Sequence, residues 1–231
     1  MLSKIRKILS SGKRRGLDQF VMDLKPKFSQ FKTVIDVGGY QGSFVEQVLL
    51  MNPSLSIHVF EPFSASCQVI KEKFSERPAV IINQMAVSEA RGEAILNINS
   101  FNETNSLLAS SQVSESIDAL TKMQSTEKVQ VVQLDEYCMD HGITYIDLIK
   151  IDTQGNSFAV LKGLQNMLTQ KRINYLYVEA EFVEIYKNEK LFSEIEILMR
   201  EFGYSIVDLY NLNYINKEKL GWCDVLFSPK N

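Results

Sequence analysis

Short apolar runs and longer amphipathic segments alternate along this chain of 231 residues. In the first half, the apolar runs are TVIDVG (33–38), LSIHVFEP (55–62) and AVIINQMAV (79–87). Runs of this length and composition are typical of strands that are buried on both faces. Segments with helical spacing separate them, and the expected N-caps are Ser43 in one segment and Ser64 or Ser66 in the other. This β-α-β-α-β order predicts an α/β fold with a doubly wound, mostly parallel sheet.

The same alternation continues in the second half, with one interruption. Strands are expected at 92–100, 145–152, 173–182, 204–210 and 222–228, helices at 158–168 and 191–203, and a strand leading into a short helix at 129–138. Because only a loop separates the last two strands, we expect them to pair antiparallel. The interruption is the polar, Ser-rich stretch 101–128, whose length indicates a functional loop or a disordered insert.

Composition narrows the class of protein. Hydrophobic residues make up 45% of the chain, enough for one sizeable core. The net charge of −3 argues against a dedicated nucleic-acid binder. Three scattered cysteines, Cys67, Cys138 and Cys223, fit a reducing compartment without disulfides, and two histidines are too few for a His-rich zinc site. No apolar run approaches the roughly 20 residues that span a bilayer, so we expect a cytoplasmic protein.

The first 16 residues form a basic segment without a single acid. Its apolar residues recur at helical spacing, and two interpretations follow. We favour a short helix packed on the domain by this apolar stripe. The alternative is weak peripheral contact of a basic helix with an anionic membrane surface. We therefore divide the chain into an N-terminal helical extension at 1–31 and a main domain at 32–231.

Four acids fall at the ends of expected strands: Asp36, Glu61, Asp152 and Glu179. In an open α/β sheet, ligands bind outside the carboxyl ends of the strands. One such acid alone is best interpreted as a helix N-cap, but four together favour a shared site. Because crowded carboxylates repel one another, a cationic or hydroxyl-rich ligand fits between them.

A glycine turn follows the first strand. Its pattern, Asp36-x-Gly38-Gly39-x-x-Gly42, departs from the G-x-G-x-x-G fingerprint of dinucleotide sites. We expect Gly38 to permit the turn and Gly42 to permit close approach of a ligand. Glu61 lies about 20 residues further on, where an acid suits hydrogen bonds to ribose hydroxyls. Together these features indicate a nucleotide-like ligand.

Six blocks in order resemble the FkbM-type S-adenosylmethionine-dependent methyltransferases over roughly 33–228. The blocks are VIDVGGYQGSF (34–44), VFEPFSA (59–65), MAVSEARGEAIL (85–96), VVQLDEYC (131–138), IDLIKIDTQGNSFAVLKGL (146–164) and YVEAEF (177–182). The resemblance implies a Rossmann-like class I methyltransferase fold, with seven strands of which the last is antiparallel. It also implies S-adenosylmethionine as the cofactor.

The resemblance further implies roles for individual residues. Asp36 and Gly38, with Gly39 and Gly42 in the same turn, are expected at the methionine end of the cofactor. Glu61, followed by Pro62, is expected to hold the ribose, and Met85 and Ala86 to flank the adenine. Asp152 would face the methyl-transfer region.

Two departures from the family pattern affect the chemistry. Gly39 and Tyr40 replace the Ala and Asn that often follow the first glycine of the family turn. Ser157 stands where the family often has a second acid, so we expect no metal site. A hydroxyl acceptor benefits from a general base, and the candidates are Asp152 and Glu179, with Glu181 third.

The resemblance implies an O-methyltransferase acting on a sugar hydroxyl of a glycan, glycolipid or natural-product precursor. The long polar stretch 101–128 is our candidate for a lid over cofactor and acceptor. Two other functions stay open: an NAD-dependent oxidoreductase, which the missing third glycine disfavours, and a non-catalytic cofactor-binding or scaffold protein. Nucleic-acid methylation is disfavoured by the net charge. We interpret Lys150 and Trp222 as structural, Tyr186 as a packing residue and His141 as an exposed loop residue.

Overall fold

A seven-stranded sheet forms the centre of the protein. The computed structural model describes residues 17–230, and the spatial order of the strands is β3-β2-β1-β7-β8-β10-β9. The strands are β1 (Thr33–Val37), β2 (Ser56–Phe60), β3 (Val80–Asn83), β7 (Ile146–Ile151), β8 (Ile173–Glu181), β9 (Tyr204–Ile215) and β10 (Lys219–Pro229). All neighbours pair parallel except β10, which runs antiparallel to β8 and β9. The predicted doubly wound sheet with an antiparallel last strand is confirmed.

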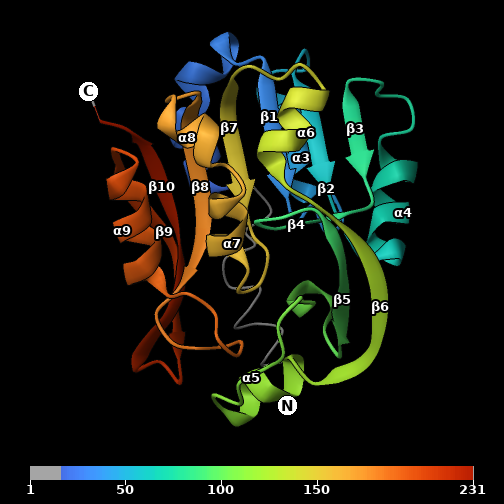
Figure 1. The fold of residues 1–231 in the computed structure, drawn as a ribbon, viewed down its shortest axis with the longest axis vertical. Coiled ribbons are helices and arrows are strands. Elements are labelled where there is room, and N and C mark those ends of the chain that lie inside the picture. Colours follow the sequence, from blue (N-terminus) through green and yellow to red (C-terminus); the bar gives the residue numbers. More distant parts are fainter. Residues whose placement is uncertain (1–16, 231) are drawn as a thin grey trace.

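Helices cover both faces of this sheet (Figure 1). They are α2 (Gln19–Leu24), α3 (Ser43–Met51), α4 (Ser64–Lys73), α6 (Leu134–Asp140), α7 (Ser157–Lys162), α8 (Gln165–Thr169) and α9 (Phe192–Glu201), with the 3-10 helix η1 (Lys25–Gln30). The helices from α2 to α4 pack on one face of the sheet and those from α6 to α9 on the other. Burial on both faces explains why the central strands are almost continuously apolar.

Two details of the helices differ from the sequence expectation. The N-cap positions belong to Gly42 and Phe63, so Ser43 and Ser64 are the first helical residues instead of the caps. The helix expected at 158–168 is divided into α7 and α8 around Gly163. A Cβ atom on Gly163 would lie 2.5 Å from the carbonyl oxygen of Ser88, so the backbone passes too close there for any other residue.

A second, three-stranded sheet lies beyond the carboxyl ends of the main strands (Figure 1). Its spatial order is β4-β6-β5, with β4 (Ala86–Val87), β5 (Gly92–Asn99) and β6 (Met123–Val132). The run 79–87, expected as one strand, is therefore shared between β3 in the main sheet and β4 in this one. A small apolar core of its own, which includes Leu96 and Val129, holds the second sheet together.

The stretch 101–128 is folded and is not a disordered insert; its role as a lid stays a prediction. It contains the 3-10 helix η2 (Asn102–Thr104), α5 (Glu115–Leu120) and the first half of β6. The Ser114 hydroxyl accepts a hydrogen bond from the backbone N–H of Ile117 and so caps α5. Isolated bridges pair Ser106 with Asn97 and Ser110 with Tyr186. These long-range pairings explain how so polar a segment is held in place.

The described part of the N-terminal extension belongs to the core. Phe20 of α2 is 1% exposed and stacks on Tyr177 of β8, with ring centroids 3.6 Å apart. The division at residue 31 stays a prediction. The basic segment 1–16, with its expected helix and membrane contact, lies outside the described residues.

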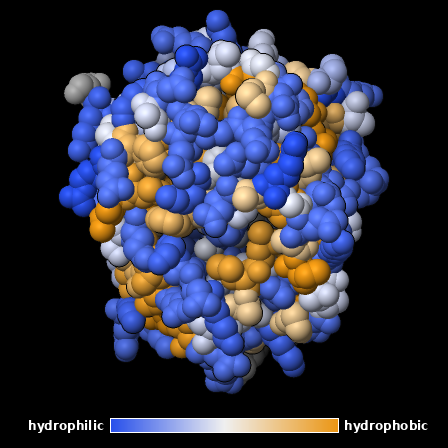
Figure 2. Space-filling view, in the orientation of Figure 1, coloured by the Kyte–Doolittle hydropathy of each residue, from blue (hydrophilic) through white to orange (hydrophobic). Residues whose placement is uncertain are grey.

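Other sequence expectations concern the surface and the thiols. Figure 2 shows hydrophilic residues over much of one face, with hydrophobic residues gathered mainly in its lower half. No helix within residues 17–230 is both long enough and apolar enough to cross a membrane. Cys67, Cys138 and Cys223 are buried free thiols.

Candidate active site

A cavity of about 310 Å³ lies at the carboxyl edge of the main sheet. The arrows of β1, β2, β7 and β8 in Figure 1 point toward this edge, and the second sheet lies beyond it. The walls come from the turn after β1, the end of β2, residues 85–87, residues 101–107, the end of β7 and the facing parts of β8, β9 and β10. All four acids that the sequence places at strand ends, Asp36, Glu61, Asp152 and Glu179, line it.

The turn after β1 is formed by glycines for two different reasons. The backbone N–H groups of Gly38 and Gly39 both donate to the Phe60 carbonyl oxygen, which closes the turn against β2. Gly38 has a φ of +85° and lines the cavity with Gly39. Gly42 does not line it: a Cβ atom there would lie 2.6 Å from the Phe74 ring, at a φ of +77°. Packing against α4, not ligand approach, explains Gly42.

Asp36 is the most unusual group in the site. It is 1% exposed, and neither of its carboxyl oxygens has a hydrogen-bond partner among the described residues. Burial raises its pKa to about 7, against the lowering effect of the Lys150 charge. Buried polar groups are normally paired, so an unpaired carboxylate in a cavity wall indicates a cationic or hydrogen-bond-donating ligand.

Glu61 follows β2 and is held by the backbone on either side of the cavity. Oε2 accepts from the N–H of Tyr40 at 2.7 Å, and Oε1 accepts from the N–H of Phe63 at 2.8 Å. Burial raises its pKa to about 7, although these two hydrogen bonds lower it. Each oxygen keeps a second lone pair, so the fixed carboxylate has capacity for a pair of hydroxyl groups.

The other residues expected near the cofactor also reach the cavity. Pro62, Met85 and Ala86 line it together, between the end of β2 and the second sheet. Ala86 is buried and Met85 packs against the main core. They form an apolar part of the wall next to Glu61.

A half-buried ion pair lines the cavity. Lys150 of β7 lies 2.9 Å from Oδ2 of Asp152, with 15% and 35% of the two side chains accessible. Burial raises the pKa of Asp152, but the charge and hydrogen bond of Lys150 and a hydrogen bond from Gln154 outweigh it, so the net shift is downward. Asp152 is therefore ionised and still reachable. Lys150, which we expected to be purely structural, lines the cavity and fixes this charge.

Glu179 of β8 lies beside Asp152 and behaves in the opposite way. Its pKa is raised well above the ordinary value, first by burial and then by the charges of Asp152, Glu181 and Asp224. Glu179 therefore holds a proton where Asp152 does not, and the two groups are hydrogen-bonded. Glu181, the third candidate base, does not line the cavity, and its Oε2 is buried without a partner among the described residues. Burial raises its pKa to about 8.

Comparison with known proteins identifies the family to which this chain belongs. Residues 36–206 match the family model described as the methyltransferase FkbM domain, which covers well over half of the chain. The protein belongs to the FkbM methyltransferase family. This family assignment confirms the resemblance carried by the glycine turn and the KIDTQG block.

Two curated relatives give the family a biochemical context. The 2-O-methyltransferase NoeI of Sinorhizobium fredii is 24% identical over 162 residues, which are 68% of this chain and 66% of NoeI. The 31-O-demethyl-FK506 methyltransferase FkbM of Streptomyces tacrolimicus is also 24% identical, over 196 residues, 75% of this chain and 73% of that protein. The match thus spans just under two thirds of NoeI.

Solved structures support the fold. The chain resembles magnesium protoporphyrin IX methyltransferase from Synechocystis PCC 6803, a structure with bound S-adenosylmethionine, with a TM-score of 0.52 and 8% identity over 98% of this chain and 84% of that one. It also resembles the 1,6-didemethyltoxoflavin-N1-methyltransferase of Burkholderia thailandensis, with a TM-score of 0.50 and 11% identity over 91% and 76% of the two chains. At these identities the likeness establishes the methyltransferase fold alone.

Some residues that line the cavity of this FkbM-family protein were not predicted from the sequence. Tyr177, Asn211 and Asp224 line the cavity from β8, β9 and β10, and Asp224 accepts hydrogen bonds from both of the others. The sequence does indicate a role for Lys150, because a lysine inside an otherwise apolar strand needs a charged or hydrogen-bonding partner. Nothing in the sequence indicates that Asn211 belongs to the site, since its position depends on how β9 pairs with β10.

The remaining expectations concern metal and single side chains. Among residues 17–230, no three His, Cys, Asp or Glu side chains are grouped so as to hold a metal ion. Ser157 is buried at the start of α7. His141 is exposed at the end of α6, stacked on Tyr137. Tyr186 is 1% exposed, and its hydroxyl reaches the residues around the cavity.

Proposed function

We propose that this FkbM-family protein is an S-adenosylmethionine-dependent O-methyltransferase whose acceptor is a sugar hydroxyl of a glycan, glycolipid or natural-product precursor. The two curated relatives support the O-methyl part, since their names place methyl groups on oxygen atoms. The acceptor class follows from the family resemblance and from the charge of the cavity.

The observation that carries the cofactor proposal is the unpaired carboxylate of Asp36 beside the glycine turn. S-adenosylmethionine carries an ammonium group, ribose hydroxyls and an apolar-edged adenine. Asp36 fits the ammonium group, Glu61 has spare lone pairs for the ribose, and Pro62, Met85 and Ala86 offer an apolar wall for the base. The residues present therefore fit this cofactor.

When bound, the cofactor supplies a methyl group already activated by its sulfonium, so positioning supplies much of the rate. The chain's own contribution is the proton. Asp152 is ionised and accessible, and it would accept the proton of the acceptor hydroxyl. Lys150 holds it in place at 2.9 Å, and Glu179 holds its own proton beside it. General-base assistance of this kind is worth about 10²–10⁴ in rate.

The charge of the cavity favours a neutral or cationic acceptor. Within the described residues, the walls carry seven acids and a single basic residue, Lys150, which is already paired with Asp152. A phosphate or carboxylate on the acceptor would find no free positive charge and several carboxyl groups, and like charges at short range disfavour binding. This argues for an uncharged sugar and against nucleic acid.

The test is methyl transfer from S-adenosylmethionine with a deuterated methyl group to fractionated cell extract, followed by mass spectrometry. Extract is separated beforehand into neutral, cationic and anionic pools. We expect label in an O-methyl sugar of a pool that is not anionic, and labelling at least about a hundredfold slower with Asp152→Asn. Label on nitrogen, carbon or nucleic acid, or in the anionic pool alone, would contradict the proposal.

A further inference from the structure

Gln154 occupies an unusual position between the candidate catalytic acids and the cavity wall. It lies three residues beyond the end of β7, in the KIDTQG block, and has a φ of +52°, a left-handed conformation that is uncommon for a residue with a side chain. Gly155 follows with a φ of +89°. The turn therefore aims the Gln154 side chain across the sheet edge instead of along the strand.

The amide of Gln154 bridges the two candidate catalytic acids. Its Nε2 donates to Oδ1 of Asp152 at 3.0 Å and to Oε2 of Glu179 at 2.8 Å. A side-chain amide nitrogen has two hydrogens, and here each faces a carboxyl group. Gln154 therefore fixes the separation and orientation of the pair.

The other atoms of Gln154 hold the wall segment 101–107. The Tyr186 hydroxyl lies 3.0 Å from Gln154 Oε1 and 3.0 Å from the carbonyl oxygen of Thr104. Ser106 Oγ donates to the backbone carbonyl of Gln154 at 2.6 Å. Ser106 and Tyr186 are both 1% exposed, so these contacts are shielded from water.

We propose that Gln154 is a positioning residue that couples the docking of the wall segment 101–107 to the geometry of the Asp152–Glu179 pair. The amide nitrogen of Gln154 holds the acids, and its side-chain and backbone oxygens accept hydrogen bonds on the side of the wall segment. When the segment is docked, the amide is oriented with its donors toward the acids. The inference rests on the proposed function only in treating that pair as the proton-handling groups.

The surrounding charges show why an amide suits this place. Lys150 faces Asp152, while Glu181 and Asp224 face Glu179, and Glu189 lies behind Glu181. A third carboxylate at 154 would add repulsion to an already acidic group, whereas an apolar side chain would remove one donor from Asp152, which keeps Lys150, and the donor to Oε2 of Glu179. The hydrogen bond from Gln154 is one of the causes that lower the pKa of Asp152.

The experiment needs neither cofactor nor acceptor, so its failure is separate from failure of the methyl-transfer proposal. Carboxyl carbons are labelled with ¹³C, and the titrations of Asp152 and Glu179 are followed by NMR. Hydrogen exchange of 101–107 is measured on the same samples. Gln154→Met keeps the length and removes the hydrogen bonds of the amide. We expect the Asp152 titration to move up by about one pH unit, the scale of one charge-assisted hydrogen bond, and exchange in 101–107 to accelerate.

Two further variants test the contact with the wall segment 101–107 and the contact with the acids separately. Tyr186→Phe removes the hydroxyl alone and should accelerate exchange in 101–107. Gln154→Glu keeps an acceptor for Tyr186 but places a third carboxyl beside the pair, so the pair should titrate at higher pH in a domain that still folds. Gln170→Met, at the exposed end of α8, should change neither readout.

The proposal is overturned if Gln154→Met leaves both titrations and the exchange of 101–107 at wild-type values. It is also overturned if this variant changes one readout without the other, because the coupling would then be absent. For Gln154→Glu, unchanged titration of Asp152 and Glu179 contradicts the positioning role.

Discussion

A Cβ atom added to Gly38 would stand 1.8 Å from the carbonyl oxygen of Asp152. The glycine turn and the end of β7 therefore meet backbone to backbone, and both Gly38 and Asp152 line the cavity. The φ of +85° at Gly38 adds to the demand for glycine. The turn that we propose to bind the cofactor and the candidate base are thus linked through the main chain.

Replacing Gly38 by alanine should disrupt this contact. We expect Gly38→Ala to lower the free energy of unfolding by more than about 2 kcal/mol, because both the clash and the left-handed backbone are unfavourable. Urea unfolding followed by circular dichroism measures it. The control is Gly92→Ala, where an added Cβ meets nothing within 4 Å. Equal stability of the two variants would show that the contact is not tight.

The unpaired Asp36 predicts an unusual dependence of stability on pH. Its pKa rises from the ordinary 3.8 to about 7 in the folded state, so the folded protein binds this proton more tightly than the unfolded chain. The stability it contributes is present below pH 3.8 and is lost as the pH rises to about 7. In Asp36→Asn this loss should disappear.

The measurement is the free energy of unfolding of Asp36→Asn minus that of the wild type, by urea unfolding of the cofactor-free protein. This difference should grow in favour of the variant as the pH rises toward 7 and then level off. The control is Asp208→Asn, on the exposed part of β9. Its free energy of unfolding relative to the wild type should not show the rise toward pH 7 that is expected for Asp36→Asn. A flat difference for Asp36→Asn would mean that a partner neutralises the group.

The stacking of Phe20 on Tyr177 predicts that residues 17–31 are required for folding. Phe20→Ala should cost about 3–5 kcal/mol, as for other buried aromatic residues. Met22→Ala, on the same helix but 41% exposed, is the matched control and should change stability little. If both variants unfold at the same denaturant concentration, the extension is not part of the core.

Asp152 as the proton acceptor predicts a specific kinetic loss. Asp152→Asn keeps the shape of the side chain and removes its charge, so kcat should fall by about 10²–10⁴ while affinity for S-adenosylhomocysteine is spared. Steady-state kinetics with the acceptor found in the labelling experiment, together with calorimetry, separate the two effects. Activity within a few-fold of wild type would contradict Asp152 as the proton acceptor.

How much of the fold can be predicted from the sequence depends on which interactions fix each helix and strand. The central strands are buried on both faces, so apolar runs such as TVIDVG and YIDLIKID identify them directly. The short connection before β10 sufficed to predict its antiparallel pairing. The second sheet was not predictable in this way, because β4 has only two residues and is defined by its parallel partner β6.

The candidate site shows the same division. Acids at strand ends were identifiable, and Asp36, Glu61, Asp152 and Glu179 do meet in one cavity. The opposite protonation states of Asp152 and Glu179 could not be predicted, because they depend on Lys150 and on burial in three dimensions. The sequence could not show either that Gly42 is explained by the Phe74 ring, since α3 and α4 meet only in the folded chain.

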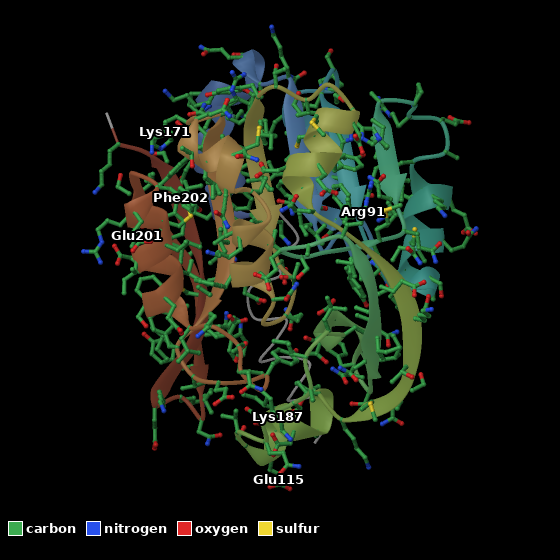
Figure 3. The ribbon with its side chains drawn as sticks, viewed as in Figure 1. Arg91, Glu115, Lys171, Lys187, Glu201 and Phe202 are labelled. Atoms are coloured by element: carbon green, nitrogen blue, oxygen red, sulfur yellow. The ribbon has the colours of Figure 1, made fainter. Side chains whose placement is uncertain are left out.

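Calorimetric titration of S-adenosylhomocysteine into the wild type and Glu61→Ala shows whether the cavity binds the cofactor and whether Glu61 holds it. A charge-assisted hydrogen bond is worth about 1.5–3 kcal/mol, so Glu61→Ala should bind at least about tenfold more weakly while remaining folded. Glu201→Gln, on the outer side of α9 far from the cavity (Figure 3), should bind like the wild type. We expect the wild type to bind S-adenosylhomocysteine and not NADH, Glu61→Ala to bind S-adenosylhomocysteine more weakly, and Glu201→Gln to bind it like the wild type. Absence of binding to the wild type, or equal affinity of Glu61→Ala, would contradict it.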